Sequence, residues 1–107
     1  MAKERVIGRS SEIPPGEGRT FEVDGKRIAV FHARTGGFFA AQADCPHKGG
    51  PLADGMLGGT TVVCPLHERS WDVATGAPAA NSDCPIAVYP IRTGEDGTLV
   101  LAPAPAA

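Results

Sequence analysis

Cys45-Pro46-His47 and Cys64-Pro65-Leu66-His67 are the two stretches that decide how this sequence folds, and residues 48–63 separate them. Each stretch offers one thiol and one imidazole from a few consecutive residues. The proline directly after each cysteine has a fixed backbone dihedral and stiffens the turn. Two tight loops of this kind are expected to bring four metal-binding side chains to one place.

Two kinds of metal centre suit these four side chains. Two thiolates and two imidazoles could hold a tetrahedral zinc ion in a zinc-stabilised binding module. They could also hold a [2Fe–2S] cluster, with both cysteines on one iron and both histidines on the other. Zinc motifs usually place like ligands next to each other, whereas here each loop carries one of each kind. Two parallel loops of this design suit a two-iron cluster with unlike ends.

The sequence around these stretches has the pattern of short strands separated by turns. No segment keeps a 3.6-residue apolar period over three turns, as a long amphipathic helix would. Asp24-Gly25 predicts a hairpin, and Gly94-Glu95-Asp96-Gly97 predicts a closing hairpin with a longer loop. Strands are expected at residues 4–8, 19–23, 26–32, 38–43, 60–63, 86–92 and 98–102. We therefore predict an all-β domain of about eight to ten short strands.

Length, charge and hydropathy argue against several classes of protein. The chain has 107 residues, which predicts a single domain over residues 1–107 with a frayed tail at 103–107. A formal charge of −2 argues against the basic surface of a nucleic-acid-binding protein. No apolar run is long enough to span a bilayer, and the charged residues 1–5 lead into no secretion signal. We expect a cytoplasmic protein that binds neither nucleic acid nor membranes.

The four residues, together with Gly49-Gly50-Pro51-Leu52 and the stretch from Trp71 to Gly76, resemble the Rieske iron–sulfur signature. The resemblance implies a small antiparallel β-sandwich or barrel with a two-loop cluster-binding subdomain, at about residues 44–59 and 64–78. It also implies one Rieske-type [2Fe–2S] cluster per chain. In that arrangement the inner iron is bound by Cys45 and Cys64, and the outer, near-surface iron by His47 and His67.

Several positions differ from the high-potential members of this family in cytochrome bc-type complexes. Those members have a disulfide between the loops, where this chain has Gly50 and Leu66. They also have a serine and a tyrosine that donate hydrogen bonds to sulfur, where this chain has Arg69 and Trp71. We therefore expect a potential toward the low end of the Rieske range, which runs from roughly −150 to +300 mV.

Two groups of Rieske proteins without a membrane anchor then remain. One is the small subunit of assimilatory NAD(P)H-dependent nitrite reductase, whose large subunit carries flavin and siroheme and reduces nitrite to ammonia. The other is the ferredoxin of ring-hydroxylating oxygenases, which more often has Cys-Pro-Trp-His-Gly in the second loop. This chain has Cys64-Pro65-Leu66-His67-Glu68, and its Cys45–Leu52 and Cys84–Arg92 stretches also look more like the nitrite reductase subunit. That subunit is the first hypothesis, and the ferredoxin is the alternative.

No residue is singled out as catalytic. The sequence suggests no substrate pocket, nucleophile or base, so the chain is expected to pass electrons to a large nitrite reductase subunit or another redox protein. An odd number of cysteines, three, argues against a disulfide framework. The third, Cys84, is expected to be a small buried residue, and His32 an ordinary surface or strand-edge histidine.

Overall fold

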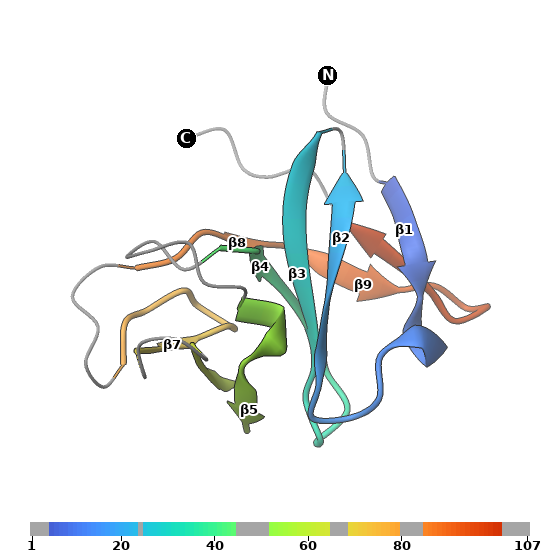
Figure 1. Cartoon of the computed structure of the whole chain (residues 1–107). Coiled ribbons are helices and arrows are strands. Elements are labelled where there is room, and N and C mark those ends of the chain that lie inside the picture. The colour runs from blue at the N-terminus through green and yellow to red at the C-terminus, as the bar shows by residue number, and fades with distance from the viewer. Residues whose placement is uncertain (1–4, 24, 45–51, 65–68, 80–84, 102–107) are drawn as a thin grey trace.

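The computed structural model describes residues 5–23, 25–44, 52–64, 69–79 and 85–101. Within them the chain forms short strands and two 3-10 helices, η1 and η2 (Figure 1). In chain order these are β1 (Arg5–Arg9), η1 (Ser10–Glu12), β2 (Gly18–Val23), β3 (Lys26–His32), β4 (Phe38–Gln42), η2 (Leu52–Asp54), β5 (Met56–Gly58), β6 (Thr61–Val63), β7 (Ser70–Asp72), β8 (Val88–Tyr89), β9 (Ile91–Thr93) and β10 (Thr98–Leu101). The prediction of an all-β fold is confirmed.

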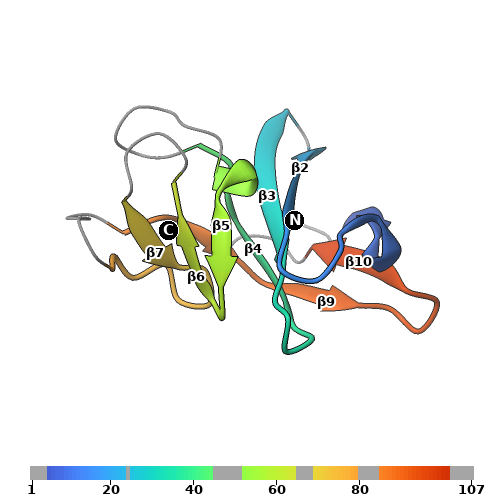
Figure 2. The same cartoon turned by 60° about the horizontal axis from the view of Figure 1, so that its bottom comes forward.

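The strands form three antiparallel sheets. The central sheet has the order β2-β3-β4-β8, the terminal sheet β1-β10-β9, and the loop sheet β5-β6-β7. In Figure 2 the loop sheet lies on one side of β3 and β4, and the terminal sheet lies on the other. The central sheet therefore separates two hydrophobic cores.

Strand β3 explains this three-layer arrangement. Its residues Ile28 to Phe31 form an uninterrupted apolar run, and each is at most 3% exposed. Side chains alternate along a strand, so such a run needs cover on both faces. Ala29 and Phe31 pack toward the loop sheet, whereas Ile28 and Val30 pack toward the terminal sheet. Burial on both faces of one strand thus holds the other two sheets in place.

The two hydrophobic cores consist of different residues. The loop-side core consists of Ala29, Phe31, Ala41, Ala43, Leu52, Ala53, Leu57, Val62, Cys64, Trp71, Val73 and Ile86. The terminal-side core consists of Ile13, Ile28, Val30, Ala40, Leu99 and Leu101. The loop-side core contains Cys64, one of the four predicted ligands, so the packing of the domain and the position of this residue are linked.

Both predicted hairpins form. Strands β2 and β3 pair with Val23 opposite Lys26, and Gly25 has a φ of +80°, a conformation that glycine adopts without strain. Strands β9 and β10 pair antiparallel across the second turn. There the Thr98 hydroxyl donates to Asp96 Oδ1 at 2.8 Å, and this hydrogen bond lowers the pKa of Asp96 below its ordinary value.

The structure differs from the expected strands at two places. The expected strand 86–92 is divided at Pro90 into β8, which pairs with β4, and β9, which pairs with β10. Proline has no N–H to donate to a sheet, and here it marks the crossing between two sheets. The ranges 44–59 and 64–78, expected to be loops, contain η2, β5 and β7 as well. The expected tail 103–107 lies outside the described residues.

Gly55 and Gly58 give a matched test of the packing in the loop sheet. A Cβ atom on Gly55 would collide with the backbone carbonyl of Val63, whereas a Cβ on Gly58 would meet nothing within 4 Å. We expect Gly55→Ala to lower the free energy of unfolding by about 1–3 kcal/mol, because backbone must shift to make room. Gly58→Ala is expected to change it by less than about 0.5 kcal/mol. Urea denaturation followed by circular dichroism measures both, and equal stabilities of the two variants would contradict this packing.

Candidate functional site

The second predicted loop is a short connection within a β-hairpin. Val63 at the end of β6 pairs with Ser70 at the start of β7. Just beyond this pair, the backbone N–H of Cys64 donates to the carbonyl oxygen of Arg69 at 2.7 Å. Residues 65–68 therefore connect two hydrogen-bonded strand ends, and His67 belongs to this connection.

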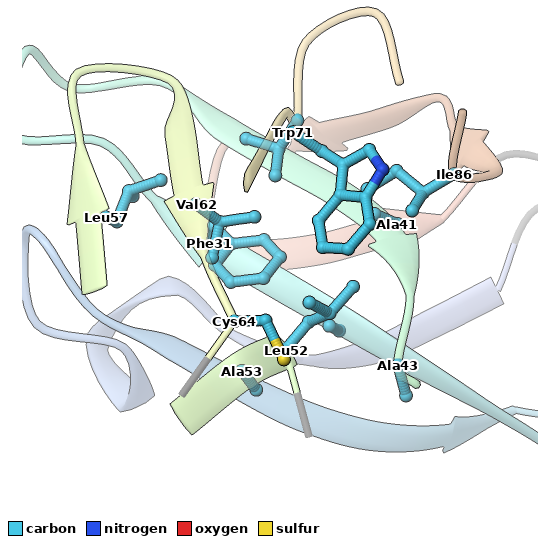
Figure 3. Close-up of a cluster of buried hydrophobic side chains, with 12 residues drawn as sticks. Phe31, Ala41, Ala43, Leu52, Ala53, Leu57, Val62, Cys64, Trp71 and Ile86 are labelled. Atoms are coloured by element: carbon cyan, nitrogen blue, oxygen red, sulfur yellow. The ribbon is translucent and has the colours of Figure 1, made fainter. Parts of the chain in front are cut away.

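The side chain of Cys64 lies in the loop-side core. It is a free cysteine with 1% of its surface exposed. Figure 3 shows its sulfur beside Leu52, and both residues belong to the same buried cluster as Phe31. The side chain of Cys64 is thus shielded from water by its apolar neighbours. In the sequence, Cys64 directly precedes residues 65–68.

The first predicted loop leaves the same core. The backbone N–H of Leu52 donates to the carbonyl oxygen of Ala43 at 2.9 Å, so residues 44–51 are closed at their base. Leu52 begins η2 and is fully buried, and Ala43 is 2% exposed. Leu52, at the end of the first loop, and Cys64, at the start of the second, therefore pack into one apolar cluster.

The structure describes one of the four predicted ligands. Cys45, His47 and His67 lie outside the described residues, as does Cys84. Within the described ranges no group of three or more His, Cys, Asp or Glu side chains could hold a metal ion. The ligand set of Cys45, His47, Cys64 and His67 consequently stays a prediction.

His32 has a structural position in the central sheet. Its Nδ1 lies 2.8 Å from the carbonyl oxygen of Ile13, and its ring stacks on Phe38 with 4.1 Å between ring centroids. The side chain is half-buried at the end of β3. These contacts account for His32 without a metal ion.

A model of the Rieske [2Fe-2S] domain matches residues 3–90 of the chain. The chain belongs to the Rieske [2Fe–2S] family. It is therefore a Rieske electron-transfer protein with a [2Fe–2S] cluster as its cofactor, and it exchanges electrons with a redox partner. This assignment removes the zinc-stabilised module from the alternatives.

Known proteins of two kinds resemble this Rieske protein. The ferredoxin component of the naphthalene 1,2-dioxygenase system from Pseudomonas aeruginosa is 34% identical over 85 residues, which cover 76% of this chain and 78% of that one. The structure of the ferredoxin of carbazole 1,9a-dioxygenase from Nocardioides aromaticivorans matches with a TM-score of 0.85 and 26% identity, over 94% of this chain and 98% of that one.

A nitrite reductase subunit has the same fold. The structure of a Mycobacterium tuberculosis protein, provisionally named an NADH-dependent nitrite reductase small subunit, matches with a TM-score of 0.88 over 99% of both chains. The two sequences are 20% identical. This likeness confirms the Rieske fold and extends no further than the fold.

The described ligand candidate fits the cofactor of the family. Rieske clusters are bound by two cysteines and two histidines, which is the donor set that the two sequence stretches supply. Cys64 is a free thiol, and it lies where a hydrogen-bonded hairpin opens into the 65–68 connection. Apolar side chains surround Cys64, and the environment of the ligands tunes the properties of such clusters.

The helical segments can also be compared with what a membrane span requires. Of the helical segments that they form, none combines the length and the apolar character that crossing a bilayer requires.

Replacing Cys64 tests its role as a ligand. We expect Cys64→Ser to retain less than about a tenth of the wild-type iron and acid-labile sulfide, since loss of an outer partner alone often weakens metal binding 10- to 100-fold. Cys84→Ser is the matched control, because Cys84 is outside the predicted ligand set, and its iron content should equal that of the wild type. A Cys64→Ser protein with full iron and sulfide would contradict the assignment.

Proposed function

We propose that this Rieske protein is the ferredoxin of a multicomponent oxygenase, and that it carries single electrons from a reductase to the oxygenase. The identity of 34% with the ferredoxin component of a naphthalene dioxygenase system carries the proposal. That identity extends over 76% of this chain, so it includes the strands as well as the cluster loops. It moves the ferredoxin, the alternative in the sequence analysis, to first place.

In this proposal Cys45 and Cys64 bind the inner iron, and His47 and His67 bind the outer iron. When bound, the cluster accepts and returns one electron. The two imidazoles are neutral, so the chain contributes two negative charges to the site instead of the four of a four-cysteine site. Because reduction adds negative charge, the smaller ligand charge raises the potential above that of plant-type ferredoxins, which is about −400 mV.

The loop sequences favour a second candidate, the small subunit of an assimilatory nitrite reductase. The second loop has Leu66 where the oxygenase ferredoxins more often have tryptophan. The Cys45–Leu52 and Cys84–Arg92 stretches also resemble that subunit. In this case the partner is a large subunit with flavin and siroheme.

The partner that copurifies from the native host separates the two candidates. We expect a tagged chain, recovered from cells grown on nitrate as the nitrogen source and from cells grown on an aromatic carbon source, to bring down a non-haem oxygenase or its flavin reductase. The optical spectrum of the complex should then lack siroheme. A siroheme and flavin spectrum, together with nitrite-dependent oxidation of NAD(P)H, would replace the first proposal with the second.

A histidine-to-cysteine exchange tests the ligand role of His67 in either candidate. We expect His67→Cys to lower the reduction potential, because a thiolate adds one negative charge to the site and moves it toward the four-cysteine limit of about −400 mV. His32→Gln is the control, since His32 is accounted for by its contacts with Ile13 and Phe38. Voltammetry of both variants gives the potentials. An intact cluster with an unchanged potential in His67→Cys would remove His67 from the ligand set.

A further inference from the structure

Gln42 joins two backbone segments through its side chain. It is the last residue of β4, and it is half-buried. Its Nε2 donates to the carbonyl oxygen of Asp44 at 2.7 Å, and its Oε1 accepts from the backbone N–H of Ala87 at 2.8 Å. Its own backbone N–H donates to the carbonyl oxygen of Ala87 at 2.9 Å. One residue therefore makes three hydrogen bonds at the point where β4 ends.

The two bonds of the side-chain amide take the place of ladder bonds where two strands separate. Strand β4 pairs with β8 through Ala40 opposite Tyr89 and Ala41 opposite Val88. Beyond that pair the chain turns away into the first loop, which would leave the N–H of Ala87 and the carbonyl of Asp44 without ladder partners. A primary amide donates and accepts at once, so it can satisfy both groups together.

The two bridged groups belong to the entry of the first loop and to a segment next to the loop-side core. The carbonyl of Asp44 belongs to the peptide unit that joins Asp44 to Cys45, a predicted ligand. Ala87 follows Ile86, which is in the loop-side core with Cys64, and the N–H of Ile86 donates to Gly76 at 2.9 Å. The amide of Gln42 thus connects the entry of the first loop to a segment that is fixed to the core.

We propose that Gln42 is a positioning residue of the cluster site, which holds the entry of the first loop in a fixed place relative to the segment 85–87. The inference rests on the proposed role of Cys45 as a ligand. Removal of the amide would leave the core intact and free the peptide unit that precedes Cys45. A looser loop releases its cluster faster and broadens the range of ligand geometries, which a spectrum of the reduced cluster reports.

Asp44 also forms an ion pair, and the effect of removing this pair can be compared with the effect of removing the amide of Gln42. Arg27 Nη1 lies 2.9 Å from Asp44 Oδ1, and both side chains are about half exposed. Exposed ion pairs contribute little to stability, because water and salt screen them. If the amide of Gln42 holds the loop entry, loss of the Arg27 pair should have a small effect on the same loop.

The test compares Gln42→Leu with two controls in the full-length protein with its cluster. We expect Gln42→Leu to lose its cluster to a chelator roughly two- to tenfold faster than the wild type, the factor that the loss of one ordinary hydrogen bond gives. Its electron paramagnetic resonance lines in the reduced state should be broader. Arg27→Gln should have wild-type rates and lines, because it removes only the exposed pair.

The second control excludes a general loss of stability. Thr98→Val removes a side-chain hydrogen bond of 2.8 Å to Asp96 in the β9–β10 turn, which lies at the far end of the molecule from the loop sheet in Figure 2. It should change the melting temperature but neither the release rate nor the line widths. Equal effects of Thr98→Val and Gln42→Leu on the cluster would overturn the proposal, and so would a Gln42→Leu protein with wild-type release and spectrum.

Two further variants separate a failure to fold, and a wrong ligand assignment, from a failure of the positioning role. Gln42→Glu at pH 8 retains the acceptor for Ala87 and loses the donor to Asp44, so it replaces Gln42→Leu if that variant does not fold, with the same expected changes. Cys45→Ser tests the underlying ligand assignment. Full cluster content in Cys45→Ser would refute the proposed ligand role, whereas a cluster-free Cys45→Ser beside a wild-type-like Gln42→Leu would refute the positioning role alone.

Discussion

The burial of β3 on both faces is the constraint on which the rest of this structure depends. Ile28 and Val30 need cover from the terminal sheet, and Ala29 and Phe31 need cover from the loop sheet. Each fully buried large side chain contributes about 1.5–3 kcal/mol of transfer free energy. A domain of this size buries a small core, so neither cover can be given up without a large loss of stability. The loop sheet is therefore both the carrier of Cys64 and a necessary half of the hydrophobic core.

Because the loop sheet is part of the hydrophobic core, the residues that flank the two cluster loops are held in fixed positions. The first loop is closed by the bond from Leu52 to Ala43, and the second by the bond from Cys64 to Arg69. Leu52 and Cys64 then pack in the same apolar cluster. Functional groups keep a defined geometry when rigid elements and packed neighbours support them, rather than long unsupported loops. Here a hairpin, a 3-10 helix and a shared core provide that support.

Local patterns predicted much of this fold, and they failed where neighbouring sheets decide the outcome. The run from Lys26 to His32 was predicted with the observed bounds, because continuous apolar character and the Asp24-Gly25 turn are local signals. Pro90 divides the expected strand 86–92 because its two halves pair with different sheets, a fact of tertiary structure. Strands β5 and β7 have three residues each and, unlike the equally short β6, contain no β-branched residue that would signal a strand. For the site, the Cys and His spacing predicted the family and its cofactor, but the amide of Gln42 has no sequence signature: its role depends on Ala87, which is 45 residues away.

The same reasoning explains why one fold serves electron carriers with different partners. The structure matches a dioxygenase ferredoxin and a nitrite reductase subunit about equally well, with TM-scores of 0.85 and 0.88. In this chain the fold depends on the two cores on either side of the central sheet. In the proposed function, recognition of a partner would depend instead on loop residues in which the two classes differ in sequence, such as Leu66 beside the predicted ligand His67. Function is then determined by the site and not by the fold. A few loop residues can change which partner an electron carrier binds, while the buried contacts of Phe31, Leu52 and Cys64 stay the same.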